Sequence, residues 1–123
     1  MMVRPVSFRM NEQTATNNYY QKVLDGLSAN QVNEAAVKEF DRFVGVLENK
    51  GIDVIVVQDT KEPDTPDSIF PNNWISFHAD GRIGLYPMYA ENRRLERRED
   101  LFERFQNHNG LNITEIVDFT EFE

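Results

Sequence analysis

Cysteine is absent from this chain of 123 residues. Without a thiol, the chain can form no disulfide, bind no metal through thiolates and supply no cysteine nucleophile. No apolar run approaches the roughly 18 residues that a membrane span needs, and the opening Met-Met-Val-Arg-Pro does not have the pattern of a signal peptide. We therefore expect a cytoplasmic protein that does not associate with membranes.

Basic residues and phosphate-binding motifs are scarce as well. The chain has 13 Lys and Arg against 21 Asp and Glu, which gives a formal net charge of -8 at pH 7. Because a nucleic-acid partner normally needs a basic face, we expect no nucleic-acid binding. An acidic balance can attract a small cationic substrate, although it more often serves solubility. There is no glycine-rich phosphate loop, and the acidic residues of 59–67 do not have the spacing of an EF-hand loop.

Apolar residues are frequent enough to build a core. Hydrophobic residues make up 40% of the chain and nine residues are Phe, each of which can bury a large area. Apolar runs predict strands over residues 2–6, 52–57, 73–78, 83–88 and 113–119. Helical periodicity predicts helices over residues 30–51 and from 91 or 92 to about 108. Two polar stretches are expected to be loops, 11–30 and the proline-containing 59–68.

The first long helix has recognisable ends and one apolar face. Asn30 is a suitable N-cap, and Gly51 can end the helix in the left-handed conformation. Apolar residues at helical spacing predict a stripe that faces the core, made of Phe40, Phe43, Val44 and Leu47. Further along the chain, Asp80 and Gly81 occupy the centre of a predicted hairpin turn.

The order of the predicted elements indicates the fold class. From residue 73 onward the order is strand, hairpin, strand, helix, strand, which is a ββαβ unit, and the part before it looks like a partial copy. Because hairpin and crossover connections occur together, we expect an α/β fold with a mixed sheet.

The segment Pro-Asp-Ser-Ile-Phe-Pro-Asn-Asn-Trp is the most informative part of the sequence. It joins a loop to a predicted strand and places Asp67, Asn72 and Asn73 around the ring of Phe70. A site for the planar, polar side chain of an amino acid needs an apolar surface to stack on, hydrogen-bonding groups for its edges and a carboxylate for its ammonium. The alternative is that Asp67 and Asn72 form turns while Phe70 and Trp74 belong to the core.

Several segments of the chain resemble the arginine deiminase-related amidinotransferases, and most closely their citrulline-utilisation hydrolase branch. They occur in the order and spacing of that family and cover nearly the whole chain. The segments are Val3-Arg4-Pro5, Phe8, Asn11, Thr14-Ala15, Asn17-Asn18, Gln21, Asp67 to Trp74, Ser76-Phe77-His78, Asp80-Gly81, Tyr86-Pro87-Met88-Tyr89 and Asn92 to Arg98.

The resemblance implies a pentein fold, which is a propeller of five ββαβ-type modules around a central active site, and it implies no metal or organic cofactor. Members of the superfamily attack the guanidinium or ureido carbon with a cysteine thiolate, use a histidine as acid or base, and hold the substrate nitrogens with carboxylates. Because the catalytic histidine of relatives belongs to a later module, we expect His78 to be structural. His108 is expected at a helix C-terminus, where an imidazolium favours the helix dipole.

Four residues match substrate-binding positions of the family. By this resemblance, Asp67 binds the α-ammonium of the substrate, Phe70 packs against its planar group and Arg93 holds its carboxylate. Asn73 stands where many relatives have an aspartate. Since an amide offers both a donor and an acceptor, we expect a preference for a ureido group over a guanidinium. For Arg93 the mixed charge of its helix equally allows a solvated surface, where we expect the other arginines of that helix to lie.

The resemblance leads us to expect the N-terminal part of a single pentein catalytic domain over residues 1–123, truncated before the catalytic His and Cys. We expect this part to bind citrulline, arginine or an analogue for a cysteine-dependent hydrolase, to be inactive alone, and to self-associate through uncovered surface. Two alternatives stay open. One is an amidinotransferase of the same superfamily, and the other is a small non-enzymatic α/β binding module.

Overall fold

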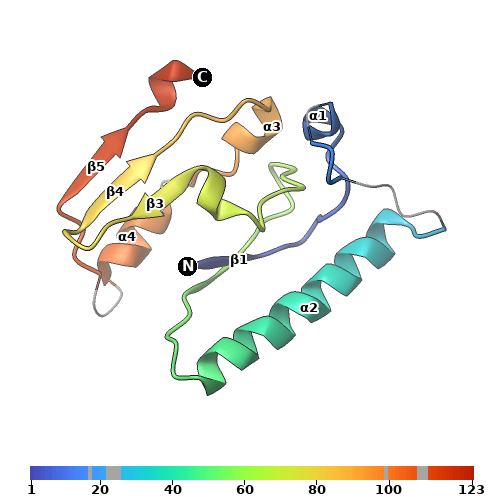
Figure 1. Cartoon of the computed structure of the whole chain (residues 1–123), viewed down its shortest axis with the longest axis horizontal. Coiled ribbons are helices and arrows are strands. Elements are labelled where there is room, and N and C mark those ends of the chain that lie inside the picture. The colour runs from blue at the N-terminus through green and yellow to red at the C-terminus, as the bar shows by residue number, and fades with distance from the viewer. Residues whose placement is uncertain (17, 22–25, 99, 108–110) are drawn as a thin grey trace. The chain divides into compact units, whose positions relative to one another are not determined.

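The computed structural model describes residues 1–16, 18–21, 26–98, 100–107 and 111–123 (Figure 1). The chain divides into two compact units, Met1–Phe70 and Pro71–Glu123. Each unit has its own small β-sheet, and the sheet of the second unit mixes parallel and antiparallel pairing. The predicted α/β class with a mixed sheet is therefore confirmed.

The first unit is a parallel β-α-β arrangement. Strand β1 (Met2–Arg4) pairs in parallel with β2 (Val56–Gln58), and Val3 lies opposite Val57. Parallel neighbours need a long crossover connection, which α2 (Ala29–Asn49) supplies. Both strands are shorter than predicted, and β2 begins at residue 56 instead of 52. Pro5 lacks a backbone N–H, so it limits β1 and thereby the length of β2 that can pair with it.

Helix α2 begins earlier than the sequence predicted. Its N-cap is Ser28, whose Oγ accepts a hydrogen bond from the Gln31 N–H at 3.3 Å, while the Ser28 N–H donates to Gln31 Oε1 at 2.9 Å. This reciprocal capping box gives hydrogen-bond acceptors to two backbone N–H groups, those of Ser28 and Gln31. The prediction of Asn30 as N-cap is therefore wrong. The predicted end is confirmed, because Gly51 follows the helix with φ +79°.

The apolar face of α2 is narrower than predicted. Phe40 is buried, and Val44 and Leu47 are partly buried. Phe43 is 53% exposed, because it lies about 60° around the helix axis from Phe40, at the margin of that face. The predicted stripe is therefore wrong at Phe43. The polar stretch before α2 contains a one-turn helix, α1 (Glu12–Ala15), within a region that was predicted to be a loop.

The second unit has the predicted ββαβ order. Strand β3 (Ile75–Phe77) pairs antiparallel with β4 (Arg82–Leu85), and β4 pairs in parallel with β5 (Glu115–Asp118). The strand order is β3-β4-β5 (Figure 1). The predicted hairpin turn is present: the Gly81 N–H donates to the His78 carbonyl at 3.0 Å, and Gly81 has φ +86°. Short 3-10 helices, η1 (Pro71–Asn73) and η2 (Thr120–Phe122), flank the sheet in sequence.

The helix predicted from residue 91 or 92 to about 108 is two helices, α3 (Glu91–Arg94) and α4 (Asp100–Asn107). After α3 the backbone tightens, and the Glu96 N–H donates to the Arg93 carbonyl three residues earlier at 3.1 Å. The reason is that charged side chains of this stretch turn inward, as described below. Helix α4 packs on the sheet, where Phe105 meets Phe77 edge to face with ring centroids 5.4 Å apart. The predicted helix end at His108 lies outside the described residues.

None of the helices in the described part of the chain combines the length and the apolar character that a membrane crossing requires.

Candidate functional site

The loops that carry the predicted residues of the first unit leave one edge of its sheet. Because β1 and β2 are parallel, both strands end at the same edge, and ligands of α/β folds commonly bind at such carboxyl edges. The chain after β1 leads to Asn11 and α1, and the chain after β2 forms the loop that ends at Phe70. This arrangement brings Asn11 to Asp67, 56 residues further along the sequence.

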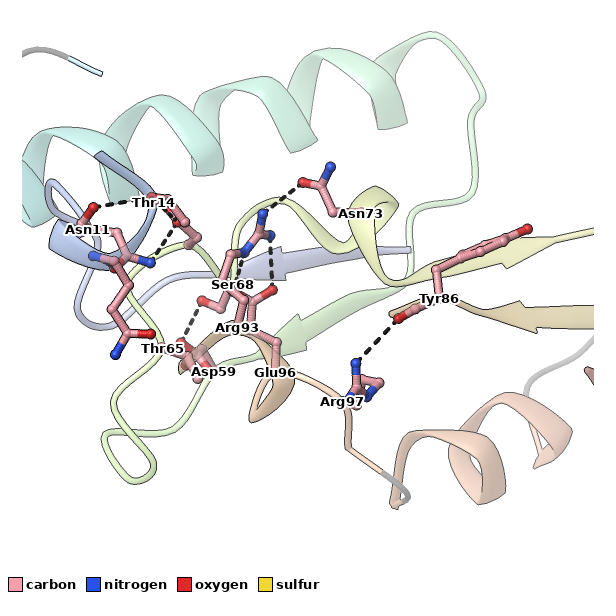
Figure 2. A network of polar contacts seen from close by, with 12 residues as sticks. Asn11, Thr14, Asp59, Thr65, Ser68, Asn73, Tyr86, Arg93, Glu96 and Arg97 are labelled. Atoms are coloured by element: carbon pink, nitrogen blue, oxygen red, sulfur yellow. Dashed lines mark hydrogen bonds and ion pairs between the residues drawn. The ribbon is translucent and has the colours of Figure 1, made fainter. Parts of the chain in front are cut away.

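Asp67 is buried, and Asn11 and Thr14 both contact its carboxylate. The residue is only 5% exposed. Asn11 Nδ2 donates to Asp67 Oδ2 at 2.8 Å, and Thr14 Oγ1 lies 3.2 Å from the same oxygen. Asn11 is itself buried and also caps α1, because its Oδ1 accepts a hydrogen bond from the Gln13 N–H at 3.1 Å. Figure 2 shows Asn11 and Thr14 turned toward each other beside the loop.

The ring of Phe70 is accessible. Phe70 is 44% exposed, and its N–H donates to the Asp67 carbonyl at 2.9 Å, which closes a turn between the two residues. The Phe8 ring meets Phe70 edge to face, with centroids 6.2 Å apart and an interplanar angle of 68°. A ring supported at one edge and partly exposed can still stack on a planar group. The alternative that Phe70 belongs to the core is therefore wrong.

The loop over 59–68 is more ordered than a plain connector. Asp59 is buried and accepts hydrogen bonds from Ser68 Oγ at 2.6 Å and from Thr65 Oγ1 at 3.4 Å (Figure 2). Arg9, which precedes α1 in the sequence, donates hydrogen bonds from two guanidinium nitrogens to the Asp64 carboxylate, at 2.9 and 2.5 Å. These contacts hold the loop in a fixed course toward Asp67. The sequence signal for them was an aspartate directly after a buried strand, followed by hydroxyl residues.

The second unit brings Asn73 and Arg93 together. Strand β3 starts where β4 ends, because they are antiparallel, and Asn73 precedes β3 while Arg93 follows β4 on α3. Arg93 Nη1 donates to Asn73 Oδ1 at 3.1 Å (Figure 2). Since the amide oxygen accepts this bond, the amide nitrogen of Asn73 is directed elsewhere. The four predicted residues thus form two pairs, one in each unit.

Arg93 forms a buried ion pair with Glu96. Its Nε and Nη2 donate to the two carboxylate oxygens of Glu96 at 2.8 and 3.0 Å. The side chain of Arg93 is 11% exposed and that of Glu96 is 1% exposed. The interpretation of this segment as a solvated charged face is therefore wrong for both residues. Burial of a charged pair requires bidentate geometry of this kind, and the pair fixes the orientation of the Arg93 guanidinium.

Arg94 and Arg97 were expected to be solvated surface residues, and this prediction is wrong. Both side chains instead donate hydrogen bonds to backbone carbonyls. Arg94 Nε donates to the Met88 carbonyl at 2.9 Å, and Arg97 Nη1 donates to the Tyr86 carbonyl at 3.3 Å. Arg97 Nη2 also donates to Glu123 Oε1 at 2.5 Å. Burial disfavours the charged form of Glu123 and by itself would raise its pKa. The hydrogen bonds from Arg97 and from the Met88 N–H have the larger combined effect and hold the pKa of Glu123 below its usual value.

His78 takes part in a short chain of polar side chains. Ser76 Oγ lies 3.0 Å from His78 Nε2 and 2.8 Å from the Tyr86 hydroxyl. Gly84 makes this contact possible, since a Cβ there would lie 2.7 Å from the Tyr86 hydroxyl. The prediction that His78 is structural stays a prediction. In the part of the chain that the structure describes, no group of three or more His, Cys, Asp or Glu side chains could hold a metal ion.

Comparison with known proteins identifies a family. The model of a family described as "N,N dimethylarginine dimethylhydrolase, eukaryotic" matches residues 4–123, which is nearly the whole chain. No curated protein and no solved structure matches the chain significantly.

Proposed function

The chain belongs to the eukaryotic N,N-dimethylarginine dimethylhydrolase family, and from this premise we propose that it supplies substrate-binding residues of a hydrolase acting on the guanidino or ureido group of an amino acid. Members of the family hydrolyse methylarginines. The family belongs to the pentein superfamily, as the sequence resemblance predicted. We propose that the ββαβ unit over 71–123 is one pentein module and that residues 1–123 are part of a single catalytic domain.

The observation that carries this proposal is the Asp67–Phe70 turn. It places a half-exposed aromatic ring three residues after a buried carboxylate, on the carboxyl edge of a parallel strand pair. We assign the α-ammonium of the substrate to Asp67 and its planar group to Phe70. A guanidinium or ureido group is flat and can lie against the ring face, while a carboxylate is the matching partner for an ammonium.

Asn73 favours recognition of a ureido group. Its Oδ1 accepts from Arg93, so the N–H groups of the amide are the donors that it can offer a ligand. A ureido carbonyl accepts such a bond, whereas a guanidinium has only donors. Hydrolysis of N,N-dimethylarginine adds water to the guanidino carbon, releases dimethylamine and leaves citrulline, which carries the ureido group. We therefore propose that Asn73 recognises citrulline or a ureido analogue better than arginine.

Arg93 is assigned to the carboxylate of the ligand. A guanidinium has five N–H donors in a rigid plane and can serve several acceptors at once. Glu96 holds this plane through Nε and Nη2, so Arg93 loses little side-chain freedom when an anion binds.

The members of this family are hydrolases, so water takes the place of the amine to which an amidinotransferase transfers the amidino group. This favours hydrolysis over amidino transfer to an amine, and it favours an enzyme part over a non-enzymatic binding module. The cysteine thiolate that the superfamily uses as nucleophile is not among these 123 residues. We propose that the chain alone binds the amino acid without forming the covalent intermediate.

Calorimetric titration of the chain with citrulline and N,N-dimethylarginine tests this function. Phe70→Ala should weaken binding of both ligands about five- to tenfold, since a stacking contact contributes about 1 kcal/mol. Asp67→Asn should weaken it by at least as much, because a charge-assisted bond is lost. Phe43→Ala is the matched control, as Phe43 is a similarly exposed phenylalanine of the same unit. Saturable binding that survives both site variants, or no binding to the unaltered chain, overturns the proposal.

The role of Arg93 needs a variant that keeps the buried charge. Arg93→Ala would leave Glu96 buried and unpaired, at a cost of about 3–5 kcal/mol of stability. Arg93→Lys retains the positive charge but loses the planar fork, so citrulline should bind roughly fivefold more weakly while the chain stays folded. Arg98→Lys, which alters an arginine paired with Asp100, is the control. Equal affinities of the Arg93→Lys variant and the unaltered chain would refute the assignment.

A further inference from the structure

Asn11 links two parts of the first unit through one buried side chain. It is 2% exposed, and its amide nitrogen donates to Asp67 Oδ2 at 2.8 Å. Its amide oxygen accepts from the Gln13 N–H at 3.1 Å, and its backbone carbonyl accepts from the Ala15 N–H at 2.9 Å. The same residue therefore starts α1 and touches the carboxylate that the proposed function assigns to the ligand ammonium.

We propose that Asn11 is a positioning residue for recognition of the α-ammonium, an inference that rests on the proposed function. A carboxylate can rotate about its bond to Cβ, and a donor on one oxygen fixes its plane. The Asn11 amide binds Oδ2 and so sets the direction in which Oδ1 points. Asn11 is itself held in place by capping α1, so its Nδ2 approaches Asp67 from a constant direction.

Thr14 supports this arrangement but cannot replace it. Its single hydroxyl proton has two acceptors at 3.2 Å, the Asn11 carbonyl and Asp67 Oδ2, and it can serve only one of them at a time. The hydroxyl also accepts from Gln21 Nε2 at 3.0 Å. The Asn11 amide nitrogen lies closer to Asp67 Oδ2, at 2.8 Å, and its amide oxygen accepts from the Gln13 N–H at 3.1 Å. Of the two donors, Asn11 therefore makes the shorter contact with the Asp67 carboxylate.

The variant Asn11→Ser separates the two roles of this residue. Serine is as good an N-cap as asparagine, so α1 keeps its cap, but the amide donor to Asp67 is lost. Ser28→Ala is the control for the loss of a helix cap in the same unit, because Ser28 caps α2 through Gln31 and not through Asp67.

The test compares citrulline with 5-ureidopentanoic acid, which is the same molecule with hydrogen in place of the α-amino group. The ratio of their two affinities measures recognition of the ammonium alone. The unaltered chain should prefer citrulline by about tenfold or more. Asn11→Ser should reduce this ratio about fivefold by weakening citrulline only, and in an Asp67→Asn background the same change should have no effect on the ratio. Ser28→Ala should leave the ratio unchanged.

A ratio that Asn11→Ser leaves unchanged overturns the inference while the proposed function stands. A ratio of one in the unaltered chain instead overturns the assignment of Asp67 and, with it, the role of Asn11. If the Asn11→Ser chain does not fold, NMR on the unaltered chain gives the answer. Citrulline should then shift the side-chain amide resonances of Asn11 and the desamino analogue should not, whereas equal shifts or no shifts would contradict the inference.

Discussion

Asn73 and its neighbour Asn72 differ in one respect that matters for ligand choice. Both lie on η1 and both are exposed, but Asn73 contacts Arg93 through Oδ1. Asn73→Asp would replace the amide donors with acceptors, which suit a guanidinium and not a ureido carbonyl. We expect the ratio of arginine affinity to citrulline affinity to rise about tenfold, measured by calorimetric titration.

Asn72→Asp adds the same charge one residue earlier and serves as the control. It should raise the affinity for cationic arginine only slightly, because an exposed charge is screened. If both variants shift the ratio equally, the effect is general electrostatics and Asn73 has no part in selecting the ligand.

The pair formed by Arg9 and Asp64 predicts how stability depends on pH. The Arg9 guanidinium, hydrogen-bonded to Asp64, holds the pKa of that carboxyl below its usual value of 3.8. A carboxyl whose folded pKa is lowered contributes stability above its unfolded pKa, and this contribution is lost as the pH falls through the folded pKa. Both side chains are over a third exposed, so we expect at most about 1 kcal/mol.

Arg9→Met should therefore lower the free energy of unfolding near neutral pH. The difference from the unaltered chain should shrink as the pH is lowered from about 5 toward 1, in chemical denaturation at each pH. Lys38→Met, which removes an exposed cation of α2, should give a difference that does not change over that range. A constant difference for Arg9→Met would show that the ion pair does not contribute.

At the level of single residues, the sequence indicated which residues to consider for a site, but not how buried they are or which groups they contact. The segment around Phe70 could be selected from its mixture of aromatic, carboxylate and amide groups, and the exposed ring agrees with that selection. The buried pairing of Arg93 with Glu96 could not be predicted, since the same spacing usually indicates a surface ion pair. The donor from Asn11 to Asp67 depends on a long-range contact that no local pattern encodes.

Among the turns, Gly81 has the strictest requirement for glycine. It has φ +86°, and a Cβ there would lie 2.3 Å from the Asn112 carbonyl oxygen. Gly51 has φ +79° but open space around it. Gly81→Ala combines left-handed strain with a clash against backbone and should cost about 2–4 kcal/mol.

Gly51→Ala, the matched control, has only the strain and should cost about 1 kcal/mol. Thermal or denaturant unfolding of the two variants measures the difference. Equal costs would mean that the contact between the β3–β4 turn and the segment before β5 is looser than the structure shows.

For helices and strands, existence and order were predictable, while boundaries were not. The ββαβ order over 71–123 and the crossover helix of the first unit follow from apolar periodicity and turn residues. Helix α2 starts at a capping box that competes with the nearby Asn30. The split between α3 and α4 depends on inward-facing Glu96 and Arg97, whose partners lie elsewhere in the unit. Such boundaries are decided by tertiary contacts.

Across the whole molecule, each unit presents its predicted residues at the carboxyl edge of its parallel strands. In the first unit this edge carries Asp67 and Phe70, and in the second it carries Asn73 and Arg93. A parallel strand pair directs its following loops to one side, so the topology of each unit explains why its loops hold the polar groups. The chain belongs to a family whose members hydrolyse methylarginines.

The most direct measurement of the central claim is intermolecular NMR contacts between the chain and bound N,N-dimethylarginine. The two N-methyl groups lie on the planar guanidino group, so they report where that group rests. We predict nuclear Overhauser effects from these methyl protons to the ring protons of Phe70 and none to those of Phe43. Contacts to Phe43 or to other exposed rings, with none to Phe70, would contradict the account.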